Sequence, residues 1–317
     1  MTSGMQAQLG MAAETTYGTA VTVTRFFPLV SENVTQDIER MESAGIIAGA
    51  RFLRSNQWAP GRVMVTGDVQ LELLQQNTAL LFEHMLGSIT SSWNAGTDVG
   101  THTVTPGSLT GLGLTVQIGR PATEDSVIPF TYKGVKIASW EVALTEGEIA
   151  TLGLTLIGQT ETTETALASA SFITDAAKPY HFLHGTMSIS SSSVCVRAIT
   201  LSGDNMLSDA RRCIGQAFID EPLEMALREY TGSMTVEFTN TTQYSYFVNG
   251  SEQSVVLTLS ASASAQATFT TNVRYDGITP NVASRDLLVT DIPIKVVAPS
   301  TDASAITLSI KTAQSEL

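Results

Sequence analysis

Hydrophobic and polar residues alternate along much of the chain with the period of two that marks half-buried β-strands. Gly, Pro, Asn and Ser separate the alternating runs at short intervals, which is typical of sandwiches and barrels rather than of a parallel α/β sheet. The sequence therefore predicts an all-β fold. The predicted strands are Val21–Phe27, Val63–Leu73, Leu112–Ile118, Val135–Leu144, Thr151–Ile157, Val194–Leu201, Met234–Phe238, Val255–Leu259 and Ile306–Ile310.

A two-part pattern occurs twice in the chain. An alternating strand at 66–73 begins with Thr-Gly and has Glu at its second-to-last position, and the segment Asn77–Gly87 follows it. The strand at 231–238 has the same features, and the segment Asn240–Gly250 follows it. Two linked matches in the same order indicate a duplicated domain.

Both of the segments that follow the repeated strands are predicted to be helices. Apolar residues recur with helical spacing between Asn77 and Leu86. Asn77 is a suitable N-cap, and Gly87 suits a left-handed C-terminal cap. Residues 241–249 are predicted to be helical by analogy with this repeat partner.

The two copies differ in length at one place. From Ser88 to Tyr132 there are 44 residues, whereas from Ser251 to Tyr275, within a second Tyr-x-Gly, there are 24. The difference predicts an insertion in the first copy at about 90–109, where Gly, Asn and Pro residues favour a long loop.

At 317 residues the chain is long enough for two domains of common size. The segment from Thr160 to Lys178 is rich in Thr and small residues and precedes Pro179, a composition typical of a linker or peripheral connection. We place the boundary near residue 175. The first domain is expected at 1–175, with an N-terminal arm and the inserted loop, and the second at 176–317.

Composition narrows the class of protein. Hydrophobic residues make up 43% of the chain and charged residues 15%, which excludes a disordered chain. The net charge is −13, and so the chain is not expected to grip nucleic acid through its phosphates. A surface that DNA slides past is compatible with this charge. The sequence predicts no secretory signal and no membrane span.

The sequence contains no pattern typical of a catalytic or metal-binding site. His181 and His184 are the one close histidine pair, but they lack clustered acidic or Cys partners, and on an alternating strand they would point to opposite faces. His84 is expected on the first helix and His102 in the inserted loop, without a local nucleophile. The run 204–209 lacks the ligand pattern of an EF-hand and is read as a solvated turn. No phosphate loop, dinucleotide fingerprint or nucleophile elbow occurs. We predict no catalytic, cofactor-binding or metal residues, and no enzyme.

The cysteines and the basic residues add little. Cys195 and Cys213 are expected to be reduced and buried, because nothing else indicates an oxidising compartment; a disulfide between them is the alternative. The basic groups lack the interleaved aromatic residues of a nucleic-acid-binding surface. Ion pairs between neighbouring subunits are an equally good explanation of these residues. These groups are Arg51, Arg54 and Arg62, and the pair Arg211–Arg212.

Several segments, taken in order, resemble a known family. The run 6–20, the run 42–46, the Thr-Gly strand at 66–73 and the Phe-Thr-Tyr-Lys-Gly strand at 130–134 are similar to segments of tail tube proteins from long-tailed, non-contractile bacteriophages. The resemblance implies tandem β-sandwich or barrel-like domains, each with one flanking helix. It also implies rings whose inner strands join in a continuous barrel and which stack into the conduit for the genome.

The same resemblance implies partners and a place. The expected partners are further copies of the chain, a tape measure protein and the tail terminator and tip proteins, with genomic DNA passing without specific binding. The expected location is the virion tail, after assembly in the host cytoplasm, with loops and the N-terminal arm touching the adjacent ring and an acidic lumen. A closed inner sheet has no free edges, and a negative lumen repels phosphates.

The duplication leads to a hypothesis about stoichiometry. If each copy is one tube domain, three chains would fill the six positions of a ring, with pseudo-sixfold symmetry; six chains per ring is the alternative. A different structural β protein, such as an adhesin, a pilin-like subunit or a capsid decoration module, is a competing interpretation. A carbohydrate-active enzyme would need aromatic walls around gathered carboxylates. The available tryptophans are Trp58, Trp93 and Trp140, of which Trp140 alternates within a strand as a core or interface residue would.

Overall fold

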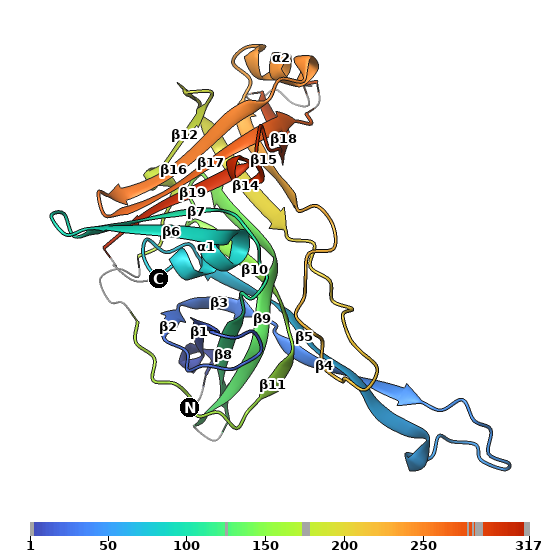
Figure 1. Cartoon of the computed structure of the whole chain (residues 1–317). Helices are drawn as coiled ribbons and strands as arrows, with labels where there is room; N and C mark the ends of the chain where they lie inside the picture. The colour runs from blue at the N-terminus through green and yellow to red at the C-terminus, as the bar shows by residue number, and fades with distance from the viewer. Residues whose placement is uncertain are drawn as a thin grey trace.

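Strands dominate the computed structural model of the chain, which confirms the predicted all-β class (Figure 1). The structure describes residues 3–123, 126–172, 178–277, 279–280, 282 and 288–313. The predicted domain boundary at residue 175 lies outside these residues. In the part of the chain described, no helix has both the length and the apolar character needed to cross a bilayer.

The elements fall into a first and a second half in chain order. The first half contains β1 (Gln8–Ala13), β2 (Arg25–Phe27), β3 (Leu29–Glu32), β4 (Thr35–Glu42), β5 (Trp58–Glu72), α1 (Ala79–Leu86), β6 (Gly87–Asn94), β7 (Val99–Pro106), β8 (Leu114–Ala122), β9 (Ser126–Thr145), β10 (Thr151–Gly158) and β11 (Thr160–Thr162). The second half contains β12 (Gly185–Ile189), β13 (Ser192–Ser193), β14 (Val196–Asp204), β15 (Glu229–Glu237), α2 (Thr242–Asn249), β16 (Gln253–Ser262), β17 (Ala265–Tyr275), β18 (Val289–Val296) and β19 (Ile306–Thr312). Short 3-10 turns occur at Gly4–Gln6, Ser55–Gln57, Phe182–His184 and Asp302–Ser304.

The strand pairings of the first half recur in the second. β1 pairs with β2 and β8, as β12 pairs with β13 and β16. The β8–β9 hairpin corresponds to the β16–β17 hairpin, and β9 pairs with β11 as β17 pairs with β19. β3 and β4 pair with β5 as β14 pairs with β15, and β5–β10–β9 corresponds to β15–β18–β17. The repeat seen in the sequence is thus accompanied by a repeated pairing pattern.

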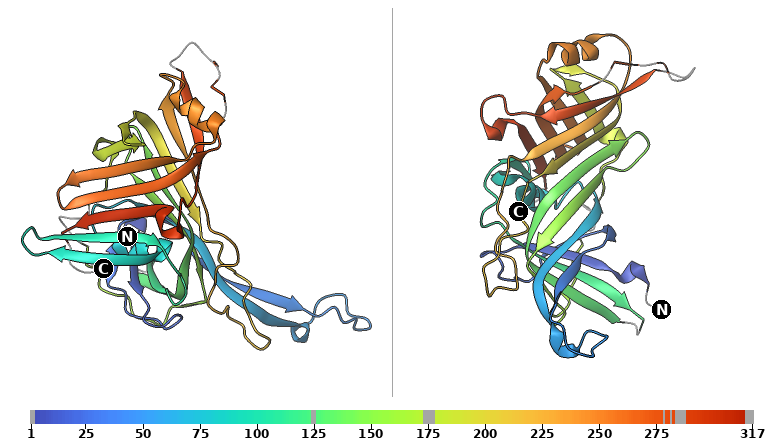
Figure 2. Two further views of the ribbon diagram at one scale, coloured as in Figure 1. Left: turned by 45° about the horizontal axis from the view of Figure 1, so that its top comes forward. Right: turned by 90° about the vertical axis from the view of Figure 1, so that its right-hand side faces the viewer.

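Two further pairings join the halves. β9 of the first half pairs with β14 of the second, which makes one continuous antiparallel sheet in the order β4–β5–β10–β9–β14–β15–β18. β7 pairs with β19, so that β16, β17, β19, β7 and β6 lie side by side (Figures 1 and 2). Leu144 and Leu201 of the continuous sheet face Leu257 and Phe269 of the second layer across a small apolar gap. These two layers enclose one part of the core, and β1, β2 and β8 contribute further core residues such as Leu9, Phe27 and Val116.

The segment at 90–109, predicted to be a long loop, is mostly a β-hairpin. β6 and β7 pair from Gly87–Pro106 to Asn94–Val99, and β7 is held against β19. The prediction of a loop was wrong because Ser and Thr make up nearly half of the residues in these two strands and hide the alternation of apolar and polar positions. In the second half, α2 leads directly to β16 without such a hairpin.

Both predicted helices form. α1 ends at Gly87, whose φ of 106° is the left-handed cap conformation predicted, and α2 ends at Gly250 with φ 62°. The predicted cap at Asn77 was wrong, because Thr78 occupies the N-cap position. The Asn77 amide instead donates to the Phe26 carbonyl and accepts from Arg25, which ties the start of α1 to β2.

Part of the connection after β10 is held against the first half. Its first residues form β11. Gln117 then donates to the Ala166 carbonyl (3.1 Å) and accepts from the Ala168 amide (2.8 Å).

The predicted strand Val21–Phe27 is a strand only at Arg25–Phe27.

Candidate functional site

The continuous sheet has one apolar face and one polar face. On β5 the buried residues Val69 and Leu71 alternate with Asp68 and Gln70, which face away from the core. The same alternation on β15 buries Met234 and Val236. Since successive side chains of a strand point to opposite sides, strands from both halves present their polar residues on a single face, here named the acidic face.

Strand register aligns the residues of the acidic face in rows across the sheet. One row, read through directly paired positions, is Asp68, Thr155, Ser139, Asp204 and Glu229. The next row is Gln70, Gly153, Glu141, Ser202, Thr231 and Lys295. Both rows cross the β9–β14 junction without a break, so the face belongs to both halves of the chain.

Hydroxyl groups on neighbouring strands hold the carboxylates of this face. Thr155 Oγ1 donates to Asp68 Oδ1 at 2.8 Å, and Ser202 Oγ donates to Glu141 Oε2 at 3.1 Å. Near the far end, Thr235 Oγ1 donates to Asp291 Oδ1 at 2.6 Å. Hydrogen bonds of this kind to charged acceptors are the stronger ones in proteins, and they fix each carboxylate in place.

Negative charge dominates the acidic face. Asp68, Glu141, Asp204 and Glu229 line a shallow hollow of about 580 Å³. The cation Lys295 is paired with Glu229 at 2.5 Å. Carboxylates accept but do not donate hydrogen bonds. The groups on this face that could bind a phosphate oxygen are therefore hydroxyls and few cations. Such a surface repels polyanions.

A long loop of the second half, residues 205–228, runs along the first half. Lys136 is buried on β9 and donates to Glu221 of this loop at 2.7 Å and to the Leu109 carbonyl at 2.6 Å. Burial lowers the pKa of Lys136, while its bond to Glu221 acts in the opposite direction. The Tyr17 ring lies 5.4 Å from the ammonium group. The loop is therefore held by a largely buried ion pair.

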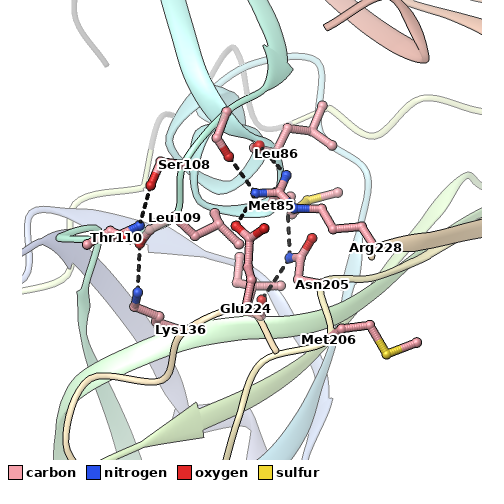
Figure 3. A network of polar contacts seen from close by, with 12 residues as sticks. Met85, Leu86, Ser108, Leu109, Thr110, Lys136, Asn205, Met206, Glu224 and Arg228 are labelled. Atoms are coloured by element: carbon pink, nitrogen blue, oxygen red, sulfur yellow. Dashed lines mark hydrogen bonds and ion pairs between the residues drawn. The ribbon is translucent and has the colours of Figure 1, made fainter. Parts of the chain in front are cut away.

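Two residues at the ends of this loop bind the end of α1 (Figure 3). Arg228 donates to the Leu86 carbonyl at 2.7 Å and to Glu224 at 2.6 Å. Asn205 is fully buried and donates to the Met85 and Ile137 carbonyls at 3.1 and 3.0 Å. The prediction that 204–209 is a solvated turn missed Asn205, because nothing local in the sequence marks one polar residue there as buried.

The histidines and cysteines do not form a reactive centre. His181 precedes a 3-10 turn that includes His184, and their ring centroids lie 3.7 Å apart; the prediction that they point to opposite faces was wrong because the segment is not a strand. Within the described ranges, no three His, Cys, Asp or Glu side chains come together as a metal site would require. Cys195 and Cys213 are free thiols but exposed, contrary to the prediction that they are buried.

The other residues singled out from the sequence are spread over the structure. His84 is buried on α1, where desolvation and nearby Lys136 lower its pKa to about 4, and His102 is buried on β7 beside Ser91. Arg62 pairs with Glu39 on the β4–β5 hairpin at 2.7 Å, whereas Arg212 donates to the Asp209 carbonyl within loop 205–228.

The tryptophan rings do not form walls around the hollow of the acidic face. Trp140 is among the residues at the hollow, but it is only 3% exposed, and its ring packs edge-on against the buried Tyr230 with centroids 5.3 Å apart. Trp58 lies on the β4–β5 hairpin and Trp93 on the β6–β7 hairpin, outside the residues that line the hollow. The hollow therefore lacks the aromatic side-chain walls that a sugar-binding cleft would need.

Comparison with known proteins bears on this surface. The sequence model of the family described as phage tail tube protein matches residues 4–310, nearly the whole chain. No curated protein matches the chain by sequence. Members of this family are structural rather than catalytic components of the virion tail. The chain therefore belongs to the phage tail tube proteins.

Proposed function

We propose that the protein assembles into rings that stack into a hollow tube, with the acidic face lining the bore through which genomic DNA passes. The observation that carries this proposal is the continuous sheet, whose polar face holds Asp68, Glu141, Asp204 and Glu229 in aligned rows from both halves. No comparable arrangement of donors or catalytic groups among the described residues suggests another use for this face.

The chemistry of the face suits passage rather than binding. Proteins grip DNA by neutralising its phosphates with Lys and Arg, and the affinity rises with the number of such contacts. The acidic face does the reverse, because its carboxylates repel phosphates and its hydroxyls fix those carboxylates. DNA would therefore remain hydrated and move without adhering.

We further propose that the chain carries two tube domains, at 1–175 and 176–317, and that three chains close a ring. Each half supplies corresponding strands to the continuous sheet, and β9–β14 joins them as neighbouring subunits would be joined. Within the described ranges, β4 pairs only with β5, and Val289–Ile292 of β18 pairs only with β15. Ring closure would cover these edges, which are otherwise prone to aggregation.

The β6–β7 hairpin would then distinguish the halves. It stands between α1 and β8, and its partner β19 comes from the other half. A ring built from three such chains would have pseudo-sixfold rather than true sixfold symmetry. Six chains per ring is the alternative stoichiometry. A tape measure protein and the tail terminator and tip proteins are the proposed partners, with assembly in the host cytoplasm.

Microscopy and a charge reversal test this function together. Concentrated purified protein should form annuli or tubes with a central channel in negative stain. Reversing the charge at two positions of the acidic face, with Glu141→Lys and Glu229→Lys, should make assembled tubes retain DNA in a gel-shift experiment. The control reverses two exposed acids elsewhere, Glu164→Lys and Glu252→Lys, with the same change in net charge. Equal DNA retention by both variants would contradict the proposed role of the acidic face.

A further inference from the structure

Loop 205–228 occupies a defined site on the first half of its own chain. The Val63 amide donates to the Ala217 carbonyl at 2.8 Å, and Gln159 Nε2 donates to the Ile219 carbonyl at 2.9 Å. Ile219 is buried in a small apolar cluster with Ile157 of β10. The site therefore lies where β5 and β10 separate, and both backbone bonds and apolar contacts fill it.

The counterpart of this loop in the first half reaches away from the body of its chain. Loop 205–228 connects β14 to β15, which correspond to β4 and β5, so its counterpart is the segment 43–57 at the tip of the β4–β5 hairpin. This hairpin projects outward in Figures 1 and 2. Ile46 is 98% exposed and Phe52 87%, and Met41, Leu53 and Trp58 are also exposed. Exposed apolar groups in such number on one hairpin mark an interaction surface.

The counterpart of the occupied site lies in the second half. Thr66 corresponds to Thr231, so three residues earlier Val63 corresponds to Arg228. Glu72 pairs with Thr151 as Glu237 pairs with Val289, so seven residues along the strand Gly158 corresponds to Val296. The same counting relates Thr160 to Ala298.

A cleft lies at these corresponding positions. Arg228, Val296 and Ala298 line it, and its volume is about 760 Å³. Clefts of roughly 300–1,000 Å³ hold drug-sized ligands, so this one has room for a few side chains. Leu227, 92% exposed, contributes apolar surface, and Asp302 contributes a negative charge. In the first half the corresponding place is filled by loop 205–228.

We propose that the tip of the β4–β5 hairpin of one chain occupies this cleft on the neighbouring chain of the same ring, as loop 205–228 occupies the first half within one chain. The occupant is thus a second copy of this chain, and the inference rests on the proposed assembly into rings. Charge contributes through Asp302, which lines the cleft and complements Arg51 and Arg54 beside the exposed apolar residues of the tip, whereas the other charged lining residues, Lys136, Glu224 and Arg228, are already in ion pairs. The contact within one chain is the template for the contact between chains.

Disulfide cross-linking of assembled protein tests the inference. Cys195→Ser and Cys213→Ser remove the native thiols, and Phe52→Cys with Leu227→Cys places one thiol on the tip and one in the cleft. Oxidation should yield a covalently closed ring, seen on a denaturing gel as a ladder that stops at three chains. A hexameric ring would stop the ladder at six and would still support the hairpin contact. Each single-cysteine variant should give no product beyond a dimer.

Other outcomes overturn the inference. A ladder that continues beyond six chains would place the hairpin on an adjacent ring rather than on a ring neighbour. Absence of any cross-link would also exclude the contact. Negative stain of the same sample then separates the two proposals: tubes without cross-links contradict the inference alone, and absence of tubes contradicts the proposed function as well. Phe52→Asp with Leu53→Asp should abolish tubes while leaving the melting temperature of the free chain unchanged, because both residues are exposed.

Discussion

Gly67 and Gly232 stand at matching positions in the two halves, and neighbouring backbone leaves no room for a side chain at either. A Cβ on Gly67 would lie 2.4 Å from the Val34 Cα, and a Cβ on Gly232 would lie 2.3 Å from the Thr200 carbonyl oxygen. Both obstructing atoms belong to the backbone and have little freedom to shift. The repeated Thr-Gly of the sequence therefore has a physical reason: the link between β3 and β4 approaches β5 closely at Gly67, and β14 approaches β15 closely at Gly232.

Gly232→Ala should destabilise the free chain by about 1–3 kcal/mol, the usual cost of overpacking a well-packed site. Urea unfolding followed by circular dichroism measures the effect. Gly4→Ala is the control, since nothing lies within 4 Å of its Cβ position. Equal midpoints for the two variants would show that the close approach at Gly232 does not exist.

His84 should make the fold sensitive to mild acid. Burial and Lys136 lower its pKa to about 4, so the folded state keeps it neutral, whereas the unfolded chain takes up a proton near pH 6.5. Its contribution is therefore complete above pH 6.5 and is lost as the pH falls toward 4, by about 3 kcal/mol. His84→Gln should flatten this part of the stability profile, measured by urea unfolding between pH 7 and 4. The same slope in wild type and variant would contradict the assignment.

At the level of elements, loop 205–228 binds the second half to the first through a few polar anchors. Lys136 is 3% exposed and has Glu221 as its ion-pair partner. Removing one partner of a buried pair leaves an uncompensated charge, whereas replacing the buried charge by an apolar group is often tolerated. Substitution of Glu221 should therefore loosen the loop more than substitution of Lys136.

Glu221→Gln should cost about 3–5 kcal/mol, because Lys136 stays buried without its counter-charge. Lys136→Met, which removes the buried charge itself, should cost much less. Limited trypsin digestion gives a local readout, since Arg211 and Arg212 lie in the loop. Faster cleavage there in Glu221→Gln than in Lys136→Met is the expected result. The reverse order would mean that the ion pair does not hold the loop.

The elements also show what the sequence could and could not predict. The two helices and most of the predicted strands were accessible, because capping glycines such as Gly87 and alternation in β9 are local signals. The β6–β7 hairpin could not be predicted, since it pairs with a strand that is more than 200 residues away in the sequence (Thr101 with Lys311). The acidic face was not predictable residue by residue either. Asp68 and Glu229 share a row only because register across the β9–β14 junction brings them together.

For the whole molecule, duplication and the β9–β14 junction together explain how one chain makes a double-length sheet. Net charge of −13 and an acidic face on that sheet fit a conduit for a polyanion. The corresponding halves are the basis for the proposal of three chains per ring, and the exposed β4–β5 tip is the contact proposed for closure. The family match over residues 4–310 is independent of this geometry.

Reconstruction of the assembled tube by electron cryomicroscopy tests this account most directly. The account predicts three chains per ring with pseudo-sixfold symmetry and the β9–β14 sheet as part of the inner wall. It also predicts that Glu141 and Asp204 face the bore. Six full-length chains per ring would contradict the stoichiometry, and an inner wall in which these two carboxylates point outward would contradict the proposed conduit.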